Sequence, residues 1–173
     1  MLVAMAGLPG SGKSTVAEAL AVRLRVPVVS VDPLESAILR SGIDDDQPTG
    51  LAAYLVAETI AEAVLRSGTG VIVDAVNAVA PARDQWVLLG ERLGTEVRFV
   101  ETVCSDLALH RRRLEQRRRD LAHIAEPTWH AVSQRLDEDT LWSGVADERP
   151  RLTLDAVSDV ESLEQKALAF VRS

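Results

Sequence analysis

Residues 7–14 read Gly7-Leu8-Pro9-Gly10-Ser11-Gly12-Lys13-Ser14 and match the pattern G-x-x-x-x-G-K-[ST] at every fixed position. The apolar run before them, residues 2–6, predicts a short buried strand. Behind them, Val16, Leu20 and Leu24 recur at the spacing of a helix. A glycine-rich loop between a strand and a helix is typical of phosphate-binding loops, because its backbone amides and the N-terminus of the helix surround an anion.

The loop predicts a role for each of its polar residues. Amides around Gly10, Gly12 and Lys13 are expected to point at a bound polyphosphate, and the Lys13 side chain to bridge its terminal phosphates. The Ser14 hydroxyl is expected to bind Mg²⁺, and Thr15 to reach the inner phosphate. An ordinary glycine-rich turn is the alternative, yet such a turn gives no reason for Lys-Ser-Thr at this offset. The expected nucleotide-binding residues of the loop are Gly7, Leu8, Pro9, Gly10, Ser11, Gly12, Lys13, Ser14 and Thr15.

The composition is that of one soluble globular domain. The chain has 173 residues, of which 47% are apolar and 26% charged, and this length suits one domain with a full core. No apolar run reaches the roughly 18 residues of a membrane span, and no basic segment precedes the first strand, so we expect a cytoplasmic protein. The single cysteine, Cys104, fits a reducing compartment and is expected to be a small buried hydrophobic residue. A net charge of −7 disfavours non-specific binding to nucleic acid.

Apolar runs and helical periodicities alternate along the chain. Strands are expected at residues 2–6, 27–31, 71–74, 97–103 and 151–155. Helices are expected directly after the loop and at residues 34–40, 51–66, 81–93, 106–118, 127–136 and 160–171, with irregular segments at 41–50 and 141–150. The alternation predicts an α/β fold, a five-stranded parallel sheet with helices on both faces. Right-handed crossovers then bring the loops after the first three strands to one edge, where ligands bind in open α/β sheets.

Two aspartates follow predicted strands at that edge. Asp32 ends the second strand, where its carboxylate is placed to accept a proton from an attacking hydroxyl. The alternative is that Asp32 caps the helix that Pro33 opens. Asp74 ends the third strand and is expected to hold Mg²⁺ directly or through water, or else to be a turn residue. Both aspartates border the place of a second substrate and are candidate substrate-binding residues.

Two further polar residues follow Asp74. Asn77 and Arg83 are each placed to orient a second substrate, so both are candidate substrate-binding residues. Asn77 is equally well explained as a cap or turn residue, and Arg83 as a solvated helix residue. Neither alternative is excluded by the sequence.

Residues 110–119 are unusual in an acidic chain, since six of the nine residues after His110 are arginines. On a helix, Arg113 and Arg117 share a face, and their repulsion is relieved by an anion such as a triphosphate. A solvated helix face and an RNA-binding patch are the alternatives. His123 and His130 have no partner at metal-ligand spacing and are expected to be polar or core residues. Trp86, Trp129 and Trp142 are expected to anchor the core or a hinge.

The order of the phosphate loop, Asp32, the strand at 71–74 and the arginine helix resembles the small P-loop kinases of the zeta-toxin, chloramphenicol-phosphotransferase and polynucleotide-kinase group. The resemblance covers most of the chain. It implies a P-loop NTPase fold like that of nucleoside monophosphate kinases, in one domain over residues 1–173 with an arginine-rich lid at about 106–135. It also implies ATP with Mg²⁺ as the phosphoryl donor.

The same resemblance implies roles for single residues. Asp32 looks like the base that activates a substrate hydroxyl, and Ser14 looks like the Mg²⁺ ligand. Arg113 and Arg117 look like the R-x-x-x-R pair of the lid, which implies that Arg113 also binds the nucleotide. The candidate catalytic residues are therefore Lys13, Asp32, Arg113 and Arg117. The chain departs from the group after its second strand, where D-x-x-R is replaced by a sequence that ends in Glu35. A carboxylate at that position would repel a phosphate, which favours a neutral or cationic small molecule as the acceptor.

Three functions are consistent with these motifs. The first is an ATP-dependent kinase that transfers the γ-phosphoryl group to a hydroxyl of a small molecule. The second is a kinase for the 5′-hydroxyl end of RNA or DNA, and the third is an ATPase switch without a phosphate acceptor. A GTPase is disfavoured because the chain contains no N-K-x-D motif. The sequence leaves the oligomeric state open.

Overall fold

The structure is a computed structural model that describes residues 1–117, 121–137 and 142–173. Within these ranges, five strands form one sheet in the order β2-β3-β1-β4-β5, and all neighbours are parallel. The strands are β1 (Leu2–Ala6), β2 (Val28–Ser30), β3 (Val71–Asp74), β4 (Val97–Val103) and β5 (Arg151–Asp155). The predicted five-stranded parallel sheet is confirmed.

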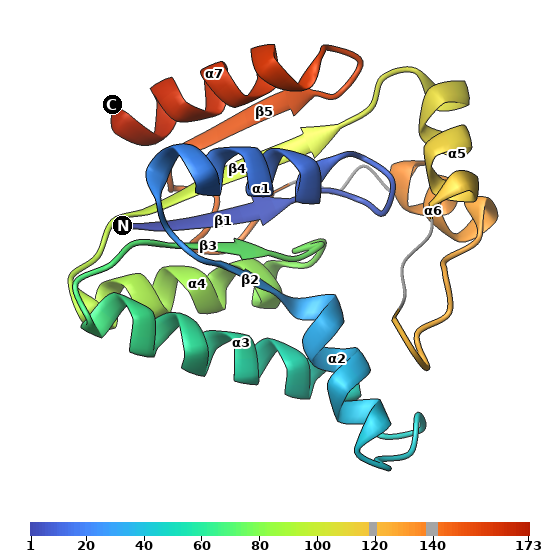
Figure 1. The fold of residues 1–173 in the computed structure, drawn as a ribbon, viewed down its shortest axis with the longest axis horizontal. Helices are drawn as coiled ribbons and strands as arrows, with labels where there is room; N and C mark the ends of the chain where they lie inside the picture. The colour runs from blue at the N-terminus through green and yellow to red at the C-terminus, as the bar shows by residue number, and fades with distance from the viewer. Residues whose placement is uncertain (118–120, 138–141) are drawn as a thin grey trace.

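Seven helices occupy the same described ranges and cover both faces of the sheet. They are α1 (Lys13–Leu24), α2 (Val31–Arg40), α3 (Thr49–Arg66), α4 (Ala80–Leu93), α5 (Leu107–Gln116), α6 (Trp129–Asp137) and α7 (Val160–Arg172). Figure 1 shows α1 and α7 on one face and α3 and α4 on the other. None of these helices is long and apolar enough to cross a bilayer, within the described residues.

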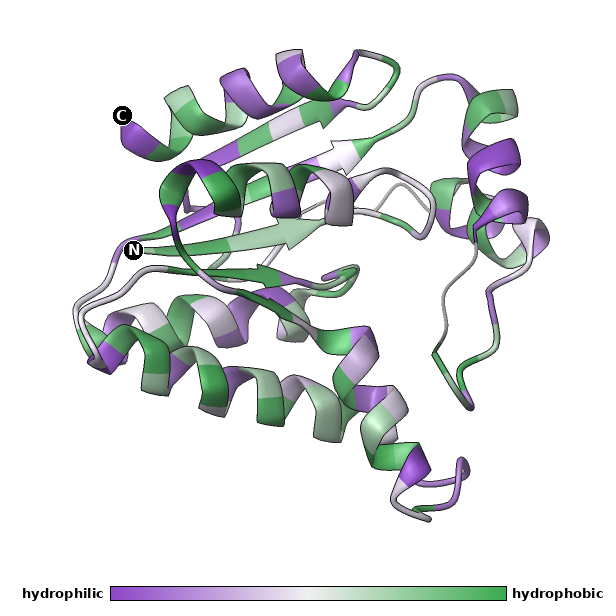
Figure 2. Cartoon of the chain, in the orientation of Figure 1, coloured by the Kyte–Doolittle hydropathy of each residue, from purple (hydrophilic) through white to green (hydrophobic). Residues whose placement is uncertain are grey.

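The two cores explain why the strands are apolar without alternation. On β1, Leu2 and Ala4 pack toward α3 and α4, whereas Val3 and Met5 pack toward α1 and α7. All four residues are fully buried, as expected of a parallel strand that has helices on both sides. Figure 2 shows the same hydrophobic character along β1 and β3.

The parallel arrangement places the carboxyl ends of all five strands at one edge. The loops after β1, β2 and β3 therefore meet there, while both termini lie at the opposite end of the sheet (Figure 1). Helices α5 and α6, in the connection between β4 and β5, also lie at the carboxyl edge. The fold positions a site between the strand ends and these two helices.

The start of α2 differs from the prediction. The second strand was expected to reach Val31, with a helix from Leu34, but the helix begins at Val31 and its N-cap residue is Ser30. Pro33 permits this early start, because the amides of the first turn lack intrahelical partners and a missing N–H costs nothing there. Asp32 thus lies in the first turn of α2, and the alternative that it is the helix cap is wrong.

The end of α5 also differs from the prediction. The helix was expected to continue to about residue 118, but it ends at Gln116, and Arg117 has extended backbone angles. Arg113 and Arg117 therefore do not share a helix face, which was the predicted arrangement. Repulsion between like charges four residues apart opposes a longer helix, and outside the helix Arg117 lies 3.9 Å from Glu126.

The remaining boundaries agree with the prediction to within two residues. Helix α3 begins two residues before the expected position, which shortens the irregular segment to residues 41–48. In the tail, α6, β5 and α7 lie where they were expected, and residues 142–150 form no helix or strand. The first part of the predicted irregular segment, residue 141, lies outside the described residues.

Gly90 allows the last turns of α4 to lie close to the start of β4. A Cβ atom built on Gly90 would lie 2.7 Å from the Thr95 carbonyl oxygen and closer still to the Val97 side chain. Val97 belongs to β4 and is 5% exposed, so it has little room to move. The close approach of this helix to its strand depends on the absence of a side chain at residue 90.

We expect Gly90→Ala to lower the free energy of unfolding by about 1–3 kcal/mol, the cost of overpacking a filled core. Gly50→Ala is the matched control, because a Cβ there would meet Glu35 at an ordinary 3.4 Å and alanine favours a helix by up to about 1 kcal/mol. Urea denaturation of both variants measures the difference. Equal stability of the two variants would contradict this account of the packing.

Candidate active site

The phosphate loop connects β1 to α1 and is held on its outer side. Gly7 N–H donates to the Val76 carbonyl at 3.1 Å, and Ser11 Oγ lies 2.8 Å from Thr102 Oγ1 in a buried hydroxyl pair. These contacts tie the loop to the segment after β3 and to β4. Glycine suits this backbone, since φ is 139°, 85° and 92° at Gly7, Gly10 and Gly12, and residues with a side chain rarely adopt such angles.

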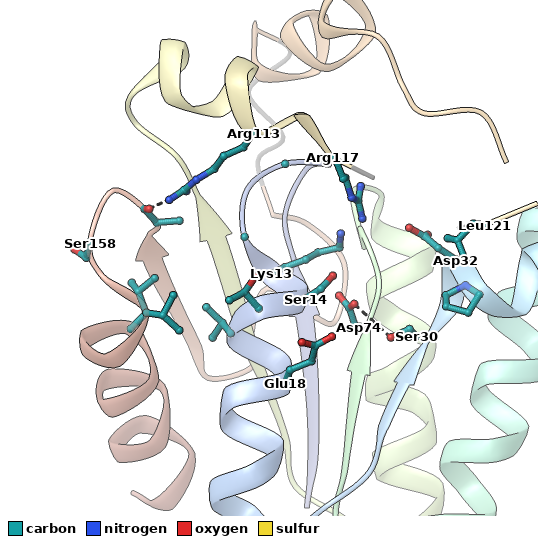
Figure 3. A pocket seen from close by; sticks show the side chains of 18 residues that line it. Lys13, Ser14, Glu18, Ser30, Asp32, Asp74, Arg113, Arg117, Leu121 and Ser158 are labelled. Carbon is teal, nitrogen blue, oxygen red and sulfur yellow. Dashed lines mark hydrogen bonds between the residues drawn. The ribbon is translucent and has the colours of Figure 1, made fainter. Parts of the chain in front are cut away.

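A cavity of about 640 Å³ lies on the inner side of the loop (Figure 3). Lys13 is the first residue of α1 and is 4% exposed, and it lines the cavity with Ser14 and Thr15. Because α1 begins at Lys13, its N-terminal amides and the positive end of its dipole lie at this cavity. The arrangement can hold a polyphosphate. Gly10 and Gly12 also line this cavity, whereas Gly7, Leu8 and Ser11 line a second one behind the loop.

Asp74, at the end of β3, and Asp32, in the first turn of α2, line the same cavity (Figure 3). Asp74 ends β3 and is 8% exposed. Its Oδ2 accepts a weak hydrogen bond from Ser30 Oγ at 3.4 Å, while its Oδ1 is buried without a hydrogen-bond partner among the described residues. The structure thus brings together Lys13, Ser14, Asp32 and Asp74, which the sequence predicted from separate loops.

The surroundings of Asp74 fit a bound Mg²⁺. A buried carboxylate oxygen without a partner costs free energy in the empty protein, and a hard cation with oxygen ligands would remove that cost. Ser14 supplies a hydroxyl at the same cavity. No group of three or more His, Cys, Asp or Glu residues can hold a metal within residues 1–117, 121–137 and 142–173. Mg²⁺ keeps waters and phosphate oxygens as ligands beside one or two protein groups, and Ser14 and Asp74 are two such groups at this cavity.

Arg113 and Arg117 line different parts of this cavity (Figure 3). Arg113 Nη1 donates to the Ala156 carbonyl at 2.9 Å, in the loop between β5 and α7. Arg117 lies on the side of Asp32. The cavity therefore extends from the β5–α7 loop, past the phosphate loop, to the start of α2. Arg118 and Arg119 of the predicted patch lie outside the described residues.

Asn77 does not join this cluster. It is 1% exposed and has a φ of 50°. Its Nδ2 donates to the Met5 carbonyl at 2.6 Å, and its Oδ1 accepts from Trp86 Nε1 at 3.0 Å. Both ends of the amide are therefore used inside the protein, which favours the turn residue over the substrate contact. The left-handed φ is one that asparagine tolerates better than most residues.

Arg83 is also placed away from the first cavity, and the alternative that it is a solvated helix residue is wrong. It is 3% exposed, donates from Nη1 to the Ala78 carbonyl at 2.9 Å, and lies over the Trp142 ring at 4.7 Å. Burial lowers the pKa of Arg83, and the nearby carboxylate of Asp84 opposes that change. No local pattern predicts this burial, because the Trp142 partner is 59 positions away.

A second cavity of about 540 Å³ lies behind the phosphate loop, and Asn77 and Arg83 line it. Residues of α5 and α6 line it as well. The first cavity is also lined by residues that the sequence did not predict, among them Glu18, Leu121, Ala156 and Ser158. Ala156 and Ser158 follow β5, and the rule that loops at the carboxyl edge carry the site could have found them.

The tryptophans and histidines agree with their predicted places. Trp86 is fully buried in the core, Trp142 packs edge-on against Phe99 at 5.0 Å, and Trp129 packs in the same way against His110 at 5.5 Å. His123 and His130 are exposed.

Comparison with known proteins shows the same architecture. The model of a family described as "AAA domain" (AAA_33) matches residues 2–155. Similar solved structures include a candidate kinase from Chloroflexus aurantiacus, with a TM-score of 0.78, 21% identity and coverage of 98% of this chain and 97% of that one. A sugar kinase from Janibacter sp. HTCC2649 has a TM-score of 0.71, 20% identity and coverage of 99% and 94%. Kti12 from Chaetomium thermophilum, in complex with ADP-AlF3, has a TM-score of 0.72, 18% identity and coverage of 99% and 97%.

No curated protein sequence matches the chain significantly. At these identities the structural likeness concerns the fold, which is that of P-loop kinases.

Cys104 follows β4 and is 4% exposed, which agrees with its predicted place as a small buried residue. Burial raises the pKa of its thiol, and the nearby Arg113 guanidinium only partly opposes this. A raised pKa leaves less thiolate at a given pH, and the thiolate is the reactive form.

We expect the reaction of Cys104 with Ellman's reagent at pH 8 to be at least about tenfold slower in the folded chain than in the chain unfolded by urea, because both access and thiolate fraction are lower. Since this is the only cysteine, the absorbance change reports one site. The pH at half-maximal rate should lie higher in the folded chain. Equal rates in the two states would contradict the burial.

Proposed function

The chain belongs to the AAA domain family, whose model spans residues 2–155, and on that premise we propose that it moves the γ-phosphoryl group of Mg-ATP to a hydroxyl group of a small molecule. The observation that carries the proposal is that one cavity is lined both by the phosphate loop and by Asp32 and Asp74. A nucleotide on the loop and a hydroxyl beside Asp32 would meet inside it. Two of the similar structures are described as kinases, which supports this reaction class.

We assign the donor end to the phosphate loop and the N-terminus of α1. Lys13 and the amides of Gly10 and Gly12 would neutralise and orient the phosphates, and phosphoryl transfer depends mainly on such positioning and charge neutralisation. ATP is the preferred donor because the chain has no N-K-x-D guanine motif. Ser14 and Asp74 would hold the Mg²⁺, whose chemistry is to neutralise charge on the β and γ phosphate oxygens.

Asp32 is the proposed general base. As the acceptor oxygen forms its bond to the γ phosphorus and the bond to the ADP oxygen breaks, the hydroxyl proton passes to the Asp32 carboxylate and from there to water. Its place in the first turn of α2 gives a fixed backbone for this carboxylate, which suits a group that must be held in position.

The lid arginines have different proposed tasks because they lie in different parts of the cavity. Arg113 contacts the β5–α7 loop and would bind the nucleotide, whereas Arg117 lies toward Asp32 (Figure 3) and would stabilise charge on the transferred group. A planar guanidinium binds phosphate oxygens through two parallel hydrogen bonds, which a lysine does not provide.

The acceptor side of the cavity favours a neutral or cationic molecule. This side is lined by Ser30, Asp32, Pro33, Asp74 and Leu121. Of the two described arginines that line the cavity, Arg117 lies on this side. Glu35 takes the position where related kinases carry an anion-binding arginine, and its Oε1 accepts from Thr49 Oγ1 at 2.9 Å. Glu35 therefore ties α2 to α3 and supplies no positive charge. Sugars, nucleosides and amino alcohols are the acceptor classes that fit.

We extend the proposal to the rest of the chain. Residues 1–173 would form one kinase domain with a lid at about 106–135, similar in its motifs to the zeta-toxin, chloramphenicol-phosphotransferase and polynucleotide-kinase group. An enzyme that consumes ATP needs a compartment that supplies it, so a cytoplasmic location is part of the proposal. Asn77 and Arg83 line the second cavity and are not part of the proposed acceptor site.

A coupled ADP-release assay over sugars, nucleosides and amino alcohols tests this function. Acceptor-stimulated turnover is the expected result. A 5′-hydroxyl oligonucleotide that takes labelled phosphate with strong salt dependence would favour the polynucleotide kinase instead. ATP hydrolysis indifferent to every alcohol would favour the ATPase switch.

We expect Asp32→Asn to lower acceptor-dependent kcat by about 10²–10⁴-fold, the usual contribution of a positioned general base, with ATP affinity retained. Lys13→Ala should instead lose ATP affinity. Asp44→Asn, in the exposed segment after α2, is the control for loss of a negative charge and should behave as the wild type. Full turnover in Asp32→Asn would refute the base assignment.

Asp74→Asn should have opposite effects on metal affinity and on stability. Loss of the carboxylate should raise the Mg²⁺ concentration at half-maximal nucleotide binding by about tenfold or more. It should also leave the protein without nucleotide as stable as the wild type or more stable by roughly 1 kcal/mol, because a buried, unpaired charged oxygen is removed. Titration calorimetry and thermal melts measure the two effects. A large loss of stability with unchanged Mg²⁺ dependence would identify Asp74 as a structural residue.

A further inference from the structure

His110 links the lid to the phosphate loop across 101 positions of sequence. It lies on α5, is 1% exposed, and its Nε2 is 2.8 Å from the carbonyl oxygen of Pro9. A carbonyl only accepts, so the proton lies on Nε2 and the imidazole donates. The other nitrogen, Nδ1, is buried without a hydrogen-bond partner among the described residues, so no acceptor there favours the opposite tautomer.

The Pro9 carbonyl belongs to a turn with two accessible arrangements. Ser11 N–H donates to the Leu8 carbonyl at 3.1 Å, and Pro9 and Gly10 are the two central residues. Proline first and a glycine with φ of 85° second define a type II turn. A type I turn has the same ends but a negative φ at its second central residue, so the two differ by a rotation of the central peptide through about half a circle. Glycine permits either arrangement at little cost.

The Pro9–Gly10 peptide carries the N–H of Gly10, one of the amides that are expected to point at the phosphates. In a trans peptide the C=O and the next N–H point in opposite directions, and the described chain contains no cis peptide bond. His110 lines the cavity behind the loop, and Gly10 lines the nucleotide cavity. With the Pro9 carbonyl held by His110, the Gly10 N–H is directed to the nucleotide side. A flipped peptide would instead present a carbonyl oxygen to the phosphates and repel them.

We propose that His110 is a positioning residue that keeps the Pro9–Gly10 peptide in the orientation needed to bind phosphate. The inference rests on the proposed function, since it concerns the affinity for nucleotide. Contacts around the turn reinforce it. A Cβ on Gly10 would lie 3.1 Å from His110 and 3.2 Å from Leu114, so α5 packs directly on the turn, and Trp129 from α6 fixes the imidazole ring edge-on.

Two variants at residue 110 separate the hydrogen bond from packing. His110→Phe keeps an aromatic ring beside Trp129 but has no hydrogen-bond donor. We expect its Kd for Mg-AMPPNP to rise about tenfold, because the Gly10 N–H would lose its hydrogen bond to a charged phosphate oxygen. His110→Gln has a side-chain N–H₂ near the place of Nε2 and should restore the affinity to within about threefold of the wild type. Calorimetry gives the Kd, and thermal melts show that both variants are folded at the temperature used.

A direct measurement on the wild type makes the test independent of how the variants fold. Nitrogen NMR of the His110 ring should show the proton on Nε2, and the Gly10 amide resonance should move strongly downfield when Mg-AMPPNP binds. The same movement should be small in His110→Phe and restored in His110→Gln.

Three results would overturn the inference. A proton on Nδ1 in the wild type would show that the ring does not donate to Pro9. Wild-type affinity in a folded His110→Phe variant would show that the bond has no effect on nucleotide, while the proposed function stands. Failure of the wild type itself to bind Mg-AMPPNP would overturn the proposed function and this inference with it.

Discussion

The burial of a parallel sheet on both faces is the constraint on which the rest of the structure depends. Strands such as β1 and β3 are fully buried, so they leave no place for charged groups along their length, and polar chemistry is confined to the strand ends. Because every strand runs in the same direction, the carboxyl ends of β2, β3 and β1, which are neighbours in that order, present Asp32, Asp74 and the phosphate loop to one cavity. Three segments far apart in the sequence converge without any local signal that joins them.

Hydrogen bonding and position together separate the polar residues of this edge into two kinds. Both ends of the Asn77 amide are bonded inside the protein, to the Met5 carbonyl and to Trp86. Arg83 donates from Nη1 to a backbone carbonyl, although its Nε is buried without a partner in the described structure. Asp74 also has such a buried atom, its Oδ1, and native proteins rarely keep one without a ligand, ion or water that completes it. Because Asp74 lines the cavity beside the phosphate loop and Arg83 lines the cavity behind it, Asp74 is the better candidate for binding the metal of a nucleotide.

The sequence predicted the sheet, the helix order and the cavity-lining aspartates because each rests on a local pattern, either an apolar run that ends at a polar residue or a motif of fixed spacing. It failed where an outcome depends on distant partners. The burial of Arg83 requires Trp142, and the departure of Arg117 from the helix is accompanied by its pairing with Glu126. The start of α2 before Pro33 was missed for a different reason, since proline is accepted anywhere in the first turn and leaves the boundary undetermined. The contact of His110 joins it to Pro9 across 101 positions, so no local pattern predicts it.

Helix α5 contacts the nucleotide cavity at the β5–α7 loop and the phosphate loop from behind, and this has a consequence for how the proposed enzyme would respond to its ligand. Arg113 reaches the β5–α7 loop, while His110, one turn earlier, holds the Pro9 carbonyl. Because both residues lie on one helix of ten residues, a displacement of α5 that frees Arg113 would also weaken the bond to Pro9. Such a displacement would remove two contributions to phosphate binding together, and a bound triphosphate, by engaging both, would favour the position in which α5 lies against the loop.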